Sequence, residues 1–99
     1  MPRKLEITRH ALRDLAHARQ WLLQDGSGPA ARDKLTRLRM AIEELPRNPL
    51  RWPVGGHADI REVPVVGYRV LYEFLKLEAG DEIVRILRVF GPYQSRDRL

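Results

Sequence analysis

The chain of 99 residues has the length of one domain, and its 43% hydrophobic and 31% charged residues are typical of a globular rather than a disordered protein. It has no cysteine and no membrane-spanning apolar run, which excludes disulfides, a thiolate zinc site and a transmembrane helix, and its basic start without an apolar signal core favours the cytoplasm. The net charge of +5 is carried mostly by arginine and indicates an acidic partner, either nucleic acid or an acidic protein segment, unless it only reflects a GC-rich genome.

The first third of the chain has the pattern of a short strand followed by a helix. Polar and apolar residues alternate over residues 4–7, and Thr8 is a suitable N-cap for a helix over about residues 9–24. Residues 25–28 end this helix. Its apolar face is expected to contain Leu12, Leu15, Trp21, Leu22 and Leu23, with close approach at Ala11, Ala16 and Ala18.

A second helix is predicted to begin at Pro29 and to end before Pro46. Its apolar stripe consists of Ala31, Leu35, Leu38, Ile42 and Leu45. Because the connection between the two helices is short, they are expected to form an antiparallel hairpin. Residues 46–59 follow as a loop, in which Trp52 is interpreted either as a lid over the edge of the core or as a platform for a ligand.

From Ile60 the hydrophobic period changes to two, which indicates strands. The strand over residues 60–65 contains Pro64 and is therefore placed at an edge, and Gly67 allows a tight turn into a strand over residues 68–74. Residues 83–89 are apolar enough for a central strand. The order β-α-α-β-β-β predicts an α+β domain over residues 1–99, with a small, mostly antiparallel sheet and the helix hairpin packed on one face.

Arginines in these strands are the main candidates for a binding site. We expect Arg69 to point to the open face of the sheet and Arg61 to approach it across the Gly67 turn. Arg85 and Arg88 are predicted on opposite faces, so that at most one of them joins the group. Alternatively, these arginines form surface ion pairs, Arg61 with Glu62, Arg69 with Glu73 and Arg85 with Glu82.

The C-terminal residues 91–99 place Tyr93 near Arg96 and Arg98, a combination that either stacks on a base while binding phosphate or leaves Tyr93 against the sheet. His10, Asp14 and His17 follow one another along one helix and could form a metal-binding ladder, but solvent-facing histidines are the favoured interpretation, and His57 stands alone in the loop. We therefore expect no metal and no cofactor. No catalytic triad, phosphate-binding glycine loop or carboxylate pair is visible in the sequence.

The segments IREVPVVGYRVLYEF (residues 60–74) and IVRILRVFGPYQSRDRL (residues 83–99), after a helix hairpin and a proline-rich connector, resemble the RelE/ParE family of bacterial toxins. The resemblance implies the toxin of a type II toxin–antitoxin pair. Its partner would be an acidic antitoxin, with a ParD-like ribbon-helix-helix N-terminus, in a heterotetramer or larger complex. The implied fold agrees with the order of elements predicted above.

The family contains two activities, because RelE-like members cleave messenger RNA on the ribosome whereas ParE-like members poison DNA gyrase by binding. One arginine of the RelE-like catalytic pattern matches Arg69. The two lysines of that pattern fall at Ile60 and Glu62, its second arginine falls at Pro92, and its terminal tyrosine falls at Arg98. The resemblance therefore favours the ParE-like branch, with Arg61, Arg69, Arg88, Tyr93 and Arg96 as candidates for binding target or antitoxin. If the chain is a ribonuclease instead, Arg69, Tyr93 and Arg96 are the catalytic candidates.

Overall fold

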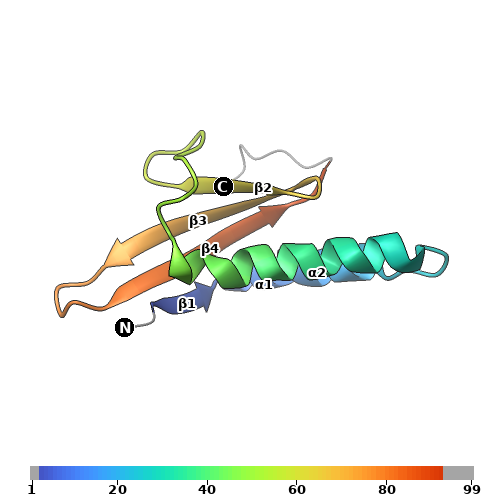
Figure 1. Ribbon diagram of the computed structural model, residues 1–99, viewed down its shortest axis with the longest axis horizontal. Coiled ribbons are helices and arrows are strands. Elements are labelled where there is room, and N and C mark those ends of the chain that lie inside the picture. The colour runs from blue at the N-terminus through green and yellow to red at the C-terminus, as the bar shows by residue number, and fades with distance from the viewer. Residues whose placement is uncertain (1–2, 93–99) are drawn as a thin grey trace.

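The computed structural model describes residues 3–92 and has the predicted α+β architecture (Figure 1). Its elements are β1 (Lys4–Ile7), α1 (Arg9–Leu22), α2 (Gly28–Glu44), a 3-10 helix η1 (Leu45–Arg47), β2 (Arg61–Val65), β3 (Tyr68–Lys76) and β4 (Glu82–Phe90). The sheet order is β1-β4-β3-β2, in which β1 runs parallel to β4 and the other neighbours are antiparallel. The expected edge position of β2 and central position of β4 are thus confirmed.

Both helices lie on the same side of the sheet, and their inner residues form the hydrophobic core with it (Figure 1). The predicted stripe of α2 is confirmed, since Leu38 and Ile42 are buried and Leu45 continues it into η1. Within residues 3–92, neither helix is long and apolar enough to cross a bilayer.

The apolar face predicted for α1 is partly wrong. Its buried residues are Ala11, Ala18 and Leu22, whereas 54% of Leu12 and 63% of Trp21 are exposed. Small alanines let the helix axis come close to the sheet, and the large side chains on either side of this narrow face then remain in solvent. The sequence pattern could not distinguish the alanine face from the faces that flank it.

Helix α1 is joined to the edge of β4 by two polar side chains, beyond the point where β1 ends. Thr8 accepts a hydrogen bond from the Ala11 amide, as an N-cap does, and its hydroxyl also donates to the Leu87 carbonyl at 3.0 Å. Asp14 accepts hydrogen bonds from Arg88 Nε and from the Val89 amide, both at 2.8 Å. Since these contacts satisfy backbone and side-chain groups along an otherwise free strand edge, they fix the helix on the sheet.

A bulge in β4 changes which side chains share a face. Leu71 lies opposite Arg88, but the next residue, Tyr72, lies opposite Ile86, so Leu87 has no cross-strand partner. The extra residue shifts the alternation of β4 by one position after Ile86. The Thr8 hydroxyl is bonded to this same Leu87 carbonyl.

The turn between β2 and β3 consists of Val66 and Gly67, because Val65 pairs with Tyr68. Both turn residues have positive φ, 45° at Val66 and 86° at Gly67. A two-residue turn with positive φ at both positions matches the right-handed twist of the flanking strands, and it fixes their register. The β-branched Val66 is unfavourable in this conformation.

Tyr72 anchors the proline-rich connector, residues 46–59, to the core. The side chain is fully buried, and its hydroxyl donates to the Pro49 carbonyl at 2.6 Å. Trp52 in the same connector packs against the core, in agreement with its interpretation as a lid.

Tyr72→Phe is expected to lower the free energy of unfolding by about 1–2 kcal/mol, because the buried Pro49 carbonyl loses its only donor in the described part of the chain. Tyr68→Phe is the matched control, since the Tyr68 hydroxyl has no hydrogen bond within residues 3–92. Urea unfolding followed by circular dichroism measures both variants. Equal destabilisation of the two would contradict the anchoring role.

Asp14→Asn is expected to lower the free energy of unfolding by about 2 kcal/mol, because it leaves the largely covered Arg88 guanidinium without its anionic partner. Asp33→Asn is the control, since it breaks an ion pair on the exposed face of α2 and is expected to cost less than about 0.5 kcal/mol. Urea midpoints of both variants test the difference. If Asp14→Asn lowered the free energy of unfolding as little as Asp33→Asn does, the contact between Asp14 and Arg88 would not stabilise the fold.

Alkaline pH is expected to destabilise the fold through Tyr68 and Tyr72, because burial raises the pKa of both phenols above their ordinary value of 10.0. Their contribution is fully present below that value and is lost as pH rises through the higher pKa of the folded state, since only the unfolded chain ionises readily there. The urea concentration at the midpoint of unfolding should fall between about pH 9 and about pH 11, and it should fall less steeply with pH in Tyr68→Phe. Parallel curves for variant and unmodified chain would contradict this.

Candidate functional site

Arg61 and Arg69 do not meet, so the expected grouping of these arginines is wrong. Arg61 lies opposite Tyr72, on the face of the sheet that packs on the helices, and its Nη1 donates to the Trp52 carbonyl at 2.5 Å. Arg69 lies opposite Pro64 on one side and Phe90 on the other, on the open face. The two-residue turn pairs Val65 with the core residue Tyr68, and Arg61 then follows Val63 and Val65 toward the helices.

The prediction that Arg85 and Arg88 lie on opposite faces is also wrong. Their partners across the ladder are Glu73 and Leu71, two positions apart on β3, so both arginines lie on the open face. The bulge at Leu87 is the reason, because it inserts one residue into the alternation of β4. A bulge of this kind has no signature in the sequence of an apolar strand.

Arg85 forms ion pairs with Glu6 at 3.2 Å and Glu73 at 3.0 Å. The predicted pairing of Arg85 with Glu82 is therefore wrong, and Glu82 instead lies 2.9 Å from Arg3. The other two predicted pairs do not form either, since Arg61 and Glu62 point to opposite faces of β2 and Glu73 is bound to Arg85.

Arg88 is held by Asp14 through Nε and Nη2, and its guanidinium stacks over the Phe90 ring at 4.7 Å from the ring centre. The side-chain hydrogen bond to Asp14 raises the pKa of Arg88. The charge of this candidate residue is thus largely compensated within the fold.

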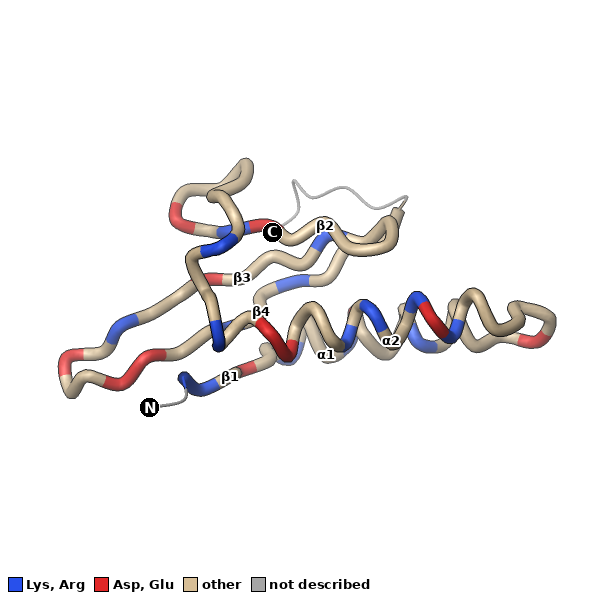
Figure 2. Tube along the Cα trace, in the orientation of Figure 1, with Lys and Arg blue, Asp and Glu red and all other residues tan. Residues whose placement is uncertain are grey.

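Arg69 differs from the other arginines of β2, β3 and β4. It is half-buried and has no hydrogen bond or ion pair to any residue in the part of the chain that the structure describes. It is the second residue of β3, whereas acidic residues gather around the β3–β4 turn at the other end of the sheet (Figure 2). Arg69 is therefore the sheet arginine best placed to bind an external anion.

Among the described residues, the open face around Arg69 does not contain the other groups of the nuclease pattern. Glu62 lies opposite Leu71 on this face, and its carboxylate accepts a hydrogen bond from the Gly56 amide at 2.9 Å. Ile60 precedes β2, and Pro92 stands where a second arginine would be needed. Tyr93, Arg96 and Arg98 lie outside the described residues. Within residues 3–92, no group of His, Asp and Glu residues is arranged to hold a metal ion.

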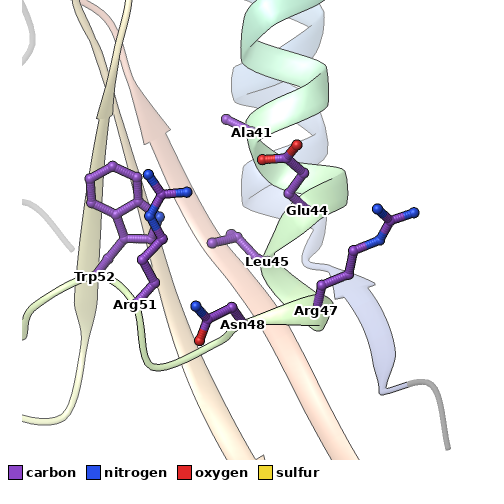
Figure 3. A pocket seen from close by; sticks show the side chains of 7 residues that line it. All are labelled: Ala41, Glu44, Leu45, Arg47, Asn48, Arg51 and Trp52. Carbon is purple, nitrogen blue, oxygen red and sulfur yellow. The ribbon is translucent and has the colours of Figure 1, made fainter.

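A pocket of about 220 Å³ lies between the end of α2 and the proline-rich connector (Figure 3). Arg51 stacks over the Trp52 ring at 4.9 Å, which presents its guanidinium edge beside the pocket. Glu44 also lines the pocket, and Arg47 points away from the indole (Figure 3). The carboxylate of Glu44 offsets one of the two positive charges that Arg47 and Arg51 bring to the lining, so the preference of the pocket for an anion is weak.

Sequence reasoning missed a second pocket, of about 330 Å³, between α1 and the C-terminal end of β4. Trp21, Tyr68 and Pro92 line it. The hydrophobic pattern places Trp21 on the buried face of α1, whereas most of its side chain is exposed beside this pocket. The spacing of four residues between His17 and Trp21 is the only signal that places both on this side of the helix.

Solved structures of toxin–antitoxin systems contain chains with the same fold. A chain of the chromosomal ParDE system of Pseudomonas aeruginosa is 14% identical with a TM-score of 0.70, and the match covers 90% of this chain and 95% of that one. A chain of the RelBE2 complex of Mycobacterium tuberculosis is 24% identical with a TM-score of 0.56, covering 92% and 99%. A chain of the Escherichia coli RelBE complex is 18% identical with a TM-score of 0.55, covering 93% and 99%.

These identities are low, so the structural matches show a shared fold. Comparison with curated protein sequences gives no match. The family model for the ParE toxin of the type II toxin–antitoxin system parDE matches residues 5–92, from β1 to the end of the described region. The chain therefore belongs to the ParE toxin family.

Proposed function

We propose that the protein is the toxin of a type II toxin–antitoxin pair and inhibits growth by binding and poisoning DNA gyrase. The observation that carries this proposal is the composition of the open face within residues 3–92, where Arg69 has no hydrogen bond or ion pair and Glu62 stands at the position of a nuclease lysine. Ile60, just before β2, stands at the position of the other lysine. Such a face can bind an acidic group, and its described residues include no general base or acid at a position matching the nuclease pattern.

Cleavage of RNA through the 2′-hydroxyl needs a group that removes a proton and cations that stabilise the phosphorane. Arg69 supplies one positive charge. The Glu62 carboxylate on the same face would oppose the negative charge that develops on phosphorus, and it is held in place by the Gly56 amide. These contacts support a toxin that acts by binding rather than by chemistry.

The second part of the proposal is the partner, an acidic antitoxin. It is a ParD-like, ribbon-helix-helix protein that assembles with the toxin as a heterotetramer or larger complex. Several cations of the described region have no hydrogen bond or ion pair there, and most lie on the helices and the connector: Lys4, Arg9, Arg13, Arg19, Arg32, Lys34, Arg47, Arg51 and Arg69. A partly disordered acidic chain that folds on binding can cover such a dispersed charge.

Induction of the chain in cells, with DNA and mRNA integrity followed in parallel, tests the target. Gyrase-linked DNA breaks are expected with intact mRNA. Arg69→Ala should reduce the breaks at least about tenfold, since truncating a central arginine of an interface typically costs that much affinity. Arg37→Ala is the control, because Arg37 is exposed on α2 and paired with Asp33, and it should leave the breaks unchanged.

A ribosome-dependent ribonuclease is the alternative, and the free Arg69 on the open face is the observation that favours it. In that case mRNA would disappear rapidly while DNA stays intact, and Tyr93→Phe or Arg96→Ala would abolish cleavage without affecting antitoxin binding. Rapid mRNA loss with intact DNA would therefore overturn the gyrase proposal.

A further inference from the structure

The pocket beside Trp21 has the features of a protein-binding anchor site. It lies between α1 and the end of β4 and is lined by Asp14, His17, Ala18, Trp21, Tyr68 and Pro92, together with Gly91. Trp21 forms one wall with 63% of its surface exposed, which is unusual for so large an apolar side chain. Tryptophan and tyrosine are among the residue types that most often dominate the binding energy of protein interfaces.

Tyr68 supplies a hydrogen-bond donor to this pocket. The residue is only 6% exposed, and its hydroxyl has no partner in the described part of the chain. The hydroxyl is nevertheless not sealed from solvent, because it is absent from the enclosed polar atoms of residues 3–92 and Tyr68 lines the pocket. Tyr72, by contrast, uses its hydroxyl within the fold.

The charges around the pocket indicate what it can bind. Asp14 is already bound to Arg88 and to the Val89 amide, and no lysine or arginine is among the lining residues. A phosphate group would therefore have no counter-charge here. An uncharged apolar side chain, followed by a carbonyl that accepts the Tyr68 hydrogen bond, fits the lining.

A row of basic side chains extends from the pocket along α1. Arg13 and Arg9 lie one and two helical turns before His17, on the same side of the helix, and neither has a partner in residues 3–92. The first turn of α1 contains no acidic residue that would compensate them. The surface thus combines an apolar anchor at Trp21 with uncompensated positive charge at Arg9 and Arg13.

We propose that this surface binds an acidic segment of the antitoxin, with an apolar side chain in the Trp21 pocket and carboxylates along Arg9 and Arg13. The segment's main-chain carbonyl next to the apolar residue accepts the hydrogen bond of Tyr68. This inference rests on the proposed function, because it takes the acidic antitoxin as the partner. It assigns the contact to α1 rather than to the open face of the sheet, where Arg69 stands.

The dissociation constant of the toxin with its full-length antitoxin tests the pocket. Trp21→Ala should weaken binding at least about tenfold, and Tyr68→Phe about threefold or more. Met40→Ala is the matched control, since Met40 is also an exposed apolar residue, 55% accessible, but lies on α2 away from the pocket. It should leave the dissociation constant unchanged. Because Trp21 and Met40 are exposed, both variants are expected to fold, as circular dichroism would verify.

The basic row is tested by charge reversal. Arg13→Glu should weaken binding more than Arg32→Glu, which reverses an equally unpaired charge on α2. In a Trp52→Phe background, Trp21 is the remaining tryptophan, and its fluorescence should shift to shorter wavelength when the antitoxin covers it. An unshifted spectrum in the formed complex would contradict burial of Trp21.

The outcomes separate this inference from the proposed function. Unchanged antitoxin affinity in both Trp21→Ala and Tyr68→Phe overturns the pocket and leaves the toxin–antitoxin assignment standing. Lost toxicity with unchanged antitoxin affinity in Trp21→Ala also overturns it, because the pocket would then bind the target. If the unmodified chain does not bind the antitoxin at all, the inference and the proposed partner fall together.

Discussion

The carboxylate of Asp14 is the contact on which most of this architecture depends. By binding both the Arg88 guanidinium and the Val89 amide, it connects α1 to the strand edge left open where β1 ends. The bulge at Leu87 brings Arg88 to a position from which it can reach around that edge. Asp14 thus holds the helix to the end of the strand while Thr8 binds the carbonyl of the bulge residue, and Asp14 is also one of the residues that line the pocket beside Trp21.

The arginines of the sheet are largely compensated within the fold, although the chain as a whole is strongly basic. The arginines of β4 are compensated by Asp14, Glu6 and Glu73, and Arg61 is bonded to a carbonyl of the connector. Among residues 3–92, the cations without a partner lie mostly on the helices and the connector, together with Lys4 in β1 and Arg69 in β3. An acidic protein therefore finds its counter-charges mostly on the helical side, whereas Arg69 is the one arginine of the described open face that has no partner.

The order of elements, the edge position of β2 and the stripe of α2 could be predicted from the sequence, because hydrophobic period and turn residues are local signals. The face of Arg61 depended on the register set by the Val66–Gly67 turn, and the face of Arg88 on a bulge inside an apolar run. Neither is encoded in local periodicity. The exposure of Trp21 was unpredictable for a related reason, since it follows from how closely the alanines of α1 approach the sheet.

The parallel pairing of β1 with β4 has a consequence for biosynthesis. The Arg85–Glu6 and Thr8–Leu87 hydrogen bonds each join residues 79 positions apart, so nearly the whole chain must be available before the first strand finds its partner. Contacts of such long sequence separation form late and slow folding. During translation β1 and the N-terminus of α1 have to wait for β4, and the surfaces that α1 and β4 form together are finished only after β4 has been synthesised.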